Sequence, residues 1–255
     1  MEASLDGVGI RKITVADLRG VLARGLDDFN ARPTHVIFLC AIYPVVAIVL
    51  ARLTSGYRML PLFFPLLSGF ALIGPIAATG VYELSRRRER GQDYAWWHAF
   101  DVLRSPSIGG LVVLGVLLAL IFLIWLQTAL TIYNMFFPET VPASVSDFVQ
   151  QVLFTEAGWG LIVVGCGVGF LFAVVVLTIS VVSLPMLLDR DVGVVTAIVT
   201  SVRAVIANPL PMAAWGLIVV AGLGIGALPL FVGLAVTLPI LGHATWHLYR
   251  AVVVR

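Results

Sequence analysis

The feature that most constrains this chain is a set of apolar segments that are long enough to cross a lipid bilayer and carry no charge. Residues 109–133 and 158–183 contain no Asp, Glu, Lys or Arg. About 20 apolar residues in a helix span the hydrocarbon core of a membrane. With 12% charged residues, a water-soluble fold would have too little polar surface to cover its apolar side chains. The sequence therefore predicts an integral membrane protein and excludes a soluble globular protein, a disordered chain and a nucleic-acid-binding module.

Six apolar segments are predicted to form transmembrane helices. They are too long for strands, and polar and apolar residues do not alternate along them. The last two segments adjoin each other, and Gly224, Gly226 and Pro229 are expected to form the turn between them. The expected fold is an all-α polytopic membrane helical bundle with spans at residues 35–51, 59–81, 109–133, 158–183, 211–227 and 228–246.

The distribution of Lys and Arg predicts how these spans are oriented. Of the 16 Lys and Arg residues, 14 lie at the two chain ends and in the second and fourth loops, and the other 2 lie in the first loop. Such residues are retained on the cytoplasmic side of a membrane. Both termini are therefore expected in the cytoplasm, and the alternation supports an even number of spans.

Four shorter segments have the apolar periodicity of helices that lie in the lipid headgroup layer. Residues 14–31, 93–104 and 194–207 are placed on the cytoplasmic side, and residues 145–153 on the opposite side. These interfacial amphipathic helices are expected to keep their charged side chains away from their apolar stripes.

Local signals predict how two of the surface helices begin. Thr14 and Asp17 offer an N-cap and a first-turn acid for the first helix, and Asp93 offers a cap for the second. Asp28 is expected on the polar face of the first helix, opposite its apolar stripe.

The order of these elements predicts a three-fold internal repeat, in which each unit is a surface helix followed by two spans. A proline follows the end of each surface helix, at Pro33, Pro106 and Pro209. Another proline lies near the inner end of each second span, at Pro75, Pro185 and Pro239. The repeat units are residues 14–90, 91–191 and 192–255, related by an axis along the membrane normal.

Four histidines are the polar residues with most chemical interest, and all are expected toward the cytoplasmic side. His243 and His247 are one helical turn apart, a spacing at which two imidazoles can bind one metal ion. A haem with two axial histidines would need His35 or His98 as a partner. The alternative is that they are amphipathic side chains at the membrane interface. No Cys, Asp or Glu lies near His243 in the sequence to complete a ligand set.

A cluster of arginines follows the second span directly. Arg86, Arg87, Arg88 and Arg90 are expected to contact anionic lipid headgroups on the cytoplasmic side or an acidic partner protein. Glu83 is expected to pair with Arg86 or Arg87 at helical spacing. The predicted span cores contain no charged residue, which argues against proton- or sodium-coupled transport.

Glycines recur in two of the spans. Gly165, Gly167 and Gly169 lie along the fourth span, and others are concentrated in the fifth. Small residues let helices approach closely. These glycines are expected to pack within the bundle or to contact another subunit.

The chain resembles an uncharacterised bacterial family of predicted six-span integral membrane proteins of unknown function, some of which are labelled putative cytochrome c oxidase subunits. The resemblance rests on Arg11-Lys12-Ile13-Thr14-Val15-Ala16-Asp17-Leu18, Gly74-Pro75 with Tyr82-Glu83-Leu84-Ser85-Arg86, Ser183-Leu184-Pro185-Met186-Leu187-Leu188-Asp189-Arg190 and Ala204-Val205-Ile206-Ala207-Asn208-Pro209. It implies six spans and a bacterial cytoplasmic (inner) membrane, and it supplies no catalytic residues.

Two classes of function are compatible with these features. The favoured one is a non-catalytic accessory or assembly subunit that packs against a larger membrane complex, for which a respiratory complex is one candidate. It is favoured because the sequence has no catalytic motif and no charge within its spans. The alternative is a transporter or channel for a neutral or amphiphilic small molecule. Membrane lipids are expected partners in both cases, and nucleic acid is not.

Overall fold

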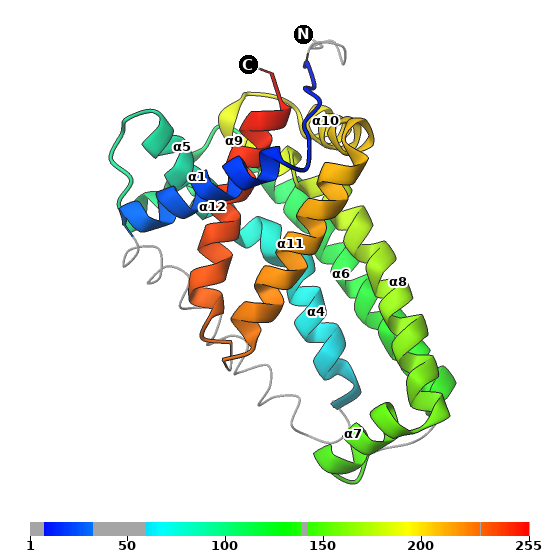
Figure 1. Ribbon diagram of the computed structural model, residues 1–255. Helices are drawn as coiled ribbons and strands as arrows, with labels where there is room; N and C mark the ends of the chain where they lie inside the picture. The colour runs from blue at the N-terminus through cyan, green and yellow to red at the C-terminus, as the bar shows by residue number, and fades with distance from the viewer. Residues whose placement is uncertain (1–7, 33–59, 139–141, 230, 255) are drawn as a thin grey trace. The chain divides into compact units, whose positions relative to one another are not determined.

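The computed structural model describes residues 8–32, 60–138, 142–229 and 231–254 (Figure 1). Within these residues the secondary structure is helical, and the one extended pairing is an antiparallel bridge between Ile10 and Val253. The all-α prediction is therefore confirmed for the described part of the chain. The helices form two compact units, one from Met1–Pro44, Gly74–Val116 and Leu177–Arg255, and the other from Val45–Ile73 and Leu117–Val176.

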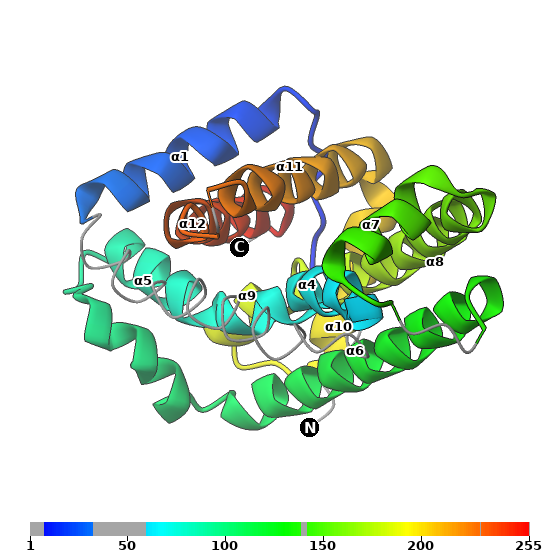
Figure 2. The same cartoon turned by 90° about the horizontal axis from the view of Figure 1, so that it is seen from below.

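The first unit is built around α12. Its helices are α1 (Asp17–Ala31), α5 (Thr79–Glu89), the 3₁₀ helix η1 (Trp96–Arg104), α9 (Ser183–Asp189), α10 (Val194–Ala207), α11 (Pro209–Ala227) and α12 (Leu234–Val252). The C-terminal half of α12 is almost fully buried, and α12 lies between α1 and α5 (Figure 2).

Two glycines allow α12 to approach its neighbours closely. A Cβ atom on Gly25 of α1 would lie 2.6 Å from the backbone nitrogen of Ala244, and one on Gly242 would lie 2.9 Å from a methyl group of Val81 on α5. Atoms cannot approach this closely without a shift of the backbone. The glycines therefore set the distance between α12 and both adjacent helices.

The second unit contains most of the long apolar helices α6 (Ile108–Phe136) and α8 (Glu156–Ser180), together with α4 (Leu60–Ala77) and α7 (Val145–Phe154). Trp125 of α6 is 3% exposed, and its indole nitrogen donates a hydrogen bond of 3.0 Å to the carbonyl of Pro65. Its ring also packs against Phe172 and covers Gly169. Because its indole nitrogen is hydrogen-bonded, Trp125 packs between α4, α6 and α8 without the free-energy cost of a buried, unpaired polar group.

Among the described residues, three helical segments are long and apolar enough to cross a membrane, namely Ile108–Phe136, Glu156–Asp189 and Pro209–Ala227. They coincide with three of the six predicted spans, at residues 109–133, 158–183 and 211–227. The predicted span 35–51 lies outside the described residues. The predicted span 59–81 is divided between two helices, because α4 ends at Ala77 and α5 begins at Thr79.

The predicted sixth span needs correction, because α12 begins at Leu234 and not at residue 228. Among the described residues, Leu228 and Pro229 and residues 231–233 lie in turns, and Phe231 has a positive φ of 65°. Gly224 and Gly226 belong to α11 instead of these turns. Gly226 serves helix packing, because a Cβ atom there would collide with Thr237 of α12.

The surface segments are helical, with three local corrections. Asp93 does not cap the second helix, because its carboxylate contacts Arg32 and His98. Thr14 does not cap α1, since its backbone nitrogen and its hydroxyl both donate to the carboxylate of Asp17. Asp28 does not lie on an exposed face, because it is only 7% exposed and turns toward α12.

Candidate functional site

A buried polar cluster joins α1, α5 and α12, and we call it the Asp28 cluster. It consists of Asp28 from α1, Ser85 and Arg88 from α5, and His243 and His247 from α12. Asp28, Ser85 and His243 are 7%, 1% and 2% exposed. Buried polar groups are stable only when they are hydrogen-bonded to one another. The cluster therefore holds α1 against α5 and α12.

The carboxylate of Asp28 is the centre of this cluster. Its Oδ2 atom accepts hydrogen bonds from the Ser85 hydroxyl at 2.7 Å and from His247 Nε2 at 2.9 Å. Its Oδ1 atom is bound by the guanidinium of Arg88, which also binds Asp27 at 2.8 Å. His243 Nδ1 lies 2.6 Å from the Ser85 oxygen.

Ser85 transmits the contact from Asp28 to His243. The hydroxyl has one proton, and this proton is directed to Asp28, so a neutral His243 donates from Nδ1 to the Ser85 oxygen. The Nε2 atom of His243 is then an acceptor, and it is buried without a partner among the described residues. Ser85 is not arranged as a nucleophile, because its proton points to a carboxylate and its side chain is buried.

The pKa of Asp28 is low despite its burial. Burial alone would raise the pKa, but hydrogen bonds from His247 and Ser85 and the electrostatic influence of the two histidines lower it more, to about 2. Asp28 is therefore ionised at neutral pH and acts as an anchor for cationic and donor groups.

Of the four histidines considered for a metal or haem, the structure describes His98, His243 and His247. His243 and His247 share the Asp28 cluster, whereas His98 lies on η1 between Asp101 at 2.7 Å and Asp93 at 3.1 Å. His35 lies outside the described residues. No group of three or more His, Cys, Asp or Glu in the described part of the chain is arranged to hold a metal ion. Metal or haem binding remains a prediction from the sequence.

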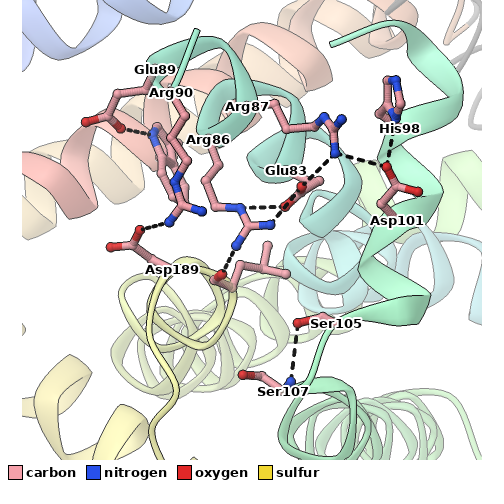
Figure 3. A network of polar contacts seen from close by, with 12 residues as sticks. Glu83, Arg86, Arg87, Glu89, Arg90, His98, Asp101, Ser105, Ser107 and Asp189 are labelled. Carbon is pink, nitrogen blue, oxygen red and sulfur yellow. Dashed lines mark hydrogen bonds and ion pairs between the residues drawn. The ribbon is translucent and has the colours of Figure 1, made fainter. Parts of the chain in front are cut away.

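The four arginines after the second span bind carboxylates of their own chain. Figure 3 shows Arg86, Arg87 and Arg90 with their partners. Arg86 pairs with Glu83 at 2.7 Å, which confirms that predicted pair, and Arg87 lies 3.1 Å from Asp101. Arg90 is 3.3 Å from Asp189. Arg88 binds Asp27 and Asp28. Lipid or partner contact by these arginines remains a prediction, and their role in joining helices is a finding.

Asp189 is a second buried anion, at the end of α9. Its carboxylate accepts hydrogen bonds of 2.7 Å from the Tyr249 hydroxyl and from Arg250, and it also pairs with Arg90. Arg250 additionally binds Glu89 of α5 at 2.9 Å. Asp189 therefore ties α9 to α5 and α12.

Asp28 and Asp189 were not predicted as site residues. For Asp28 a signal exists in the sequence, because the buried residues of α1 recur at helical spacing and Asp28 falls on that same face. An acid on an apolar face indicates a buried partner. No comparable local signal identifies Asp189, because its partners come from distant segments.

Comparison with known proteins gives one match. Residues 63–189 match the family described as "Predicted integral membrane protein (DUF2189)". No curated protein and no solved structure matches the chain. The matched segment contains Ser85, the four arginines and Asp189, but not Asp28 or the paired histidines. With its membrane-capable helices, the chain is an integral membrane protein, and its residues 63–189 are similar to this family of predicted integral membrane proteins, DUF2189.

Proposed function

We propose that this protein is a non-catalytic accessory or assembly subunit that packs against a larger membrane complex, with a respiratory complex as one candidate. The observation that supports the proposal is that the buried carboxylates bind side chains of their own chain. Asp28, Glu83 and Asp189 are each bound by side chains of the same chain. Such pairs fix helices in place, whereas an enzyme or ion carrier needs polar groups that reach a substrate.

The surface of α8 supports a contact with another subunit. Val163, Phe170 and Leu171 are 68%, 65% and 62% exposed. A Cβ atom on Gly167, which lies on the same helix face as these three residues, would have no neighbour within 4 Å among the described residues. In a lipid-facing helix, glycine lowers the stability of the helix by up to about 1 kcal/mol relative to alanine. At a helix–helix contact it allows close approach, which favours a protein partner for this face.

We propose further that the chain crosses a bacterial cytoplasmic (inner) membrane six times, with both termini in the cytoplasm. The order η1, α6, α8 and then α10, α11, α12 supports the repeat of one surface helix and two spans. Pro75 in α4, Pro185 in α9 and Pro239 in α12 recur at corresponding places. The positions of Lys and Arg support this orientation.

Purification in native-membrane nanodiscs tests the proposed role. A tagged protein expressed at its natural level is expected to elute with a fixed set of other subunits. Gly167→Leu should remove these subunits without lowering thermal stability, because the added side chain meets no described residue. Gly109→Leu is a matched control on α6, where a side chain also meets no described residue. A lone or homo-oligomeric particle would contradict the proposal and favour a transporter or channel.

A further inference from the structure

A pocket of about 490 Å³ lies in the first unit, away from the Asp28 cluster. Its walls are the segment 11–13, the first turns of α1 and the C-terminal end of α12. Its lining includes four cationic side chains and one acid: Arg11, Lys12, Arg24, Arg250 and Asp17. A pocket of this size accommodates a small ligand, and its charge is that of a site for an anion.

Three of these cations have no acidic partner among the described residues. Arg11 and Lys12 are exposed, and Arg24 donates to the carbonyl of Gly20. Arg250 is bound to Glu89 and Asp189. The carboxylate of Asp17 is held by two hydrogen bonds from Thr14, at 2.7 and 2.8 Å. The unneutralised charge of the pocket is therefore positive.

The backbone that carries Arg11 and Lys12 is fixed before any ligand binds. The Arg11 nitrogen donates to the carbonyl of Val252 at 2.7 Å, and its carbonyl accepts from Asn208 at 3.2 Å. The Ile13 nitrogen donates to Asn208 at 2.8 Å, and Asn208 is 2% exposed. A wall that is ordered in advance lowers the entropic cost of binding.

We propose that this pocket binds a phosphate group, with Arg11, Lys12 and Arg24 as its ligands. Guanidinium and ammonium groups form short charge-assisted hydrogen bonds with phosphate oxygens. Arg250 forms the inner wall and remains bound to its own acids. The phosphate belongs to an anionic lipid headgroup or to a soluble phosphate compound, and the two sources share this recognition chemistry.

The test uses the purified full-length protein in a neutral detergent. Three probes are added separately: dioctanoyl phosphatidic acid, dioctanoyl phosphatidylcholine and inorganic phosphate. Binding is measured by native mass spectrometry and by the ligand-induced rise in melting temperature. We expect phosphatidic acid or inorganic phosphate to bind more tightly than phosphatidylcholine, and less tightly as salt increases.

Two kinds of variant then locate the binding site. The double variant Arg11→Gln with Lys12→Gln is expected to weaken binding roughly tenfold or more, because it removes two charge-assisted contacts. Gly20→Leu should also weaken it, since Gly20 lines the pocket and a side chain there meets no described residue. Arg19→Gln is the control, because Arg19 is exposed on α1 outside the pocket lining.

The outcomes distinguish the two sources and can overturn the proposal. Binding of inorganic phosphate supports a soluble ligand, and binding of phosphatidic acid alone supports a lipid headgroup. Equal binding of phosphatidylcholine and phosphatidic acid overturns the proposal. So does an equal loss of affinity in Arg19→Gln and in the double variant, or no loss in the double variant. Melting temperatures without ligand check that no variant is less stable than the unmodified protein.

Discussion

His247 Nε2 lies 2.9 Å from Asp28 Oδ2, although 219 positions separate the two residues in the chain. The contact fixes the last turns of α12 to the end of α1. The His243 ring reaches the same carboxylate through Ser85. Because Arg88 binds the other oxygen, the packing of α1, α5 and α12 against one another depends on one buried carboxylate.

Asp28→Asn is expected to destabilise the protein by about 3 kcal/mol, because it leaves Arg88 and His247 without a buried counter-charge. Asp27→Asn is the matched control, since Asp27 also pairs with Arg88 but its side chain is 72% exposed. An exposed pair contributes roughly 1 kcal/mol or less. Reversible unfolding in mixed detergent micelles, followed by circular dichroism, measures both variants. Equal losses would contradict a central role for Asp28.

Acid should weaken the contribution of Asp28. Folding lowers the pKa of this carboxyl from 3.8 to about 2, so the unfolded chain binds more protons between these values. The stabilisation, about 2 kcal/mol, is present above about pH 4 and is lost as the pH falls toward about 2. The stability difference between the unmodified protein and Asp28→Asn, measured at pH 5 and pH 2, should shrink. An unchanged difference would show that Asp28 is not the titrating group.

Gly25→Ala is expected to destabilise the protein by roughly 1–3 kcal/mol, because its methyl group would overlap the backbone of Ala244. Gly20→Ala on the same helix should instead stabilise it by up to about 1 kcal/mol, since nothing described lies within 4 Å and alanine favours helix. Thermal melts of the two variants provide the measurement. If Gly25→Ala is as stable as Gly20→Ala, α1 does not pack on α12 as described.

Asp189→Asn is expected to cost about 3 kcal/mol, because Arg250 and Tyr249 lose their buried anionic acceptor. Asp191→Asn, two residues later at an exposed position, should change the unfolding free energy by less than about 0.5 kcal/mol. Chemical unfolding of the two variants under the same conditions tests this difference. A similar small effect for both would remove Asp189 as the link between α9 and α12.

The sequence was sufficient to predict the long helices, because an uncharged apolar run can be stable only in lipid or in a core. The predicted runs 109–133 and 158–183 lie within helical segments of the structure. The pair of Glu83 and Arg86 was also predictable, because helical spacing places the two side chains together. These features depend on residues that are close in the chain.

Contacts between residues that are far apart in the chain, and helix boundaries without a local signal, could not be predicted from the spacing of residues in the sequence. The contact of His247 with Asp28 was not predicted, because only tertiary packing brings the two residues together. A turn between the last two spans was predicted, but the start of α12 at Leu234 was not, because apolar residues continue past the turn and no polar break marks where the helix begins. The 3₁₀ form of η1 has no signal in its apolar periodicity.

The proposed topology places the two chain ends of this membrane protein on the opposite side of the membrane from α7. Reporter fusions at Ser146 within α7 and at the C-terminus test it most directly, with one reporter active only in the cytoplasm and another active only outside. We expect the C-terminal fusion to report the cytoplasm and the Ser146 fusion to report the outside. Fusions that report the same compartment would contradict the account.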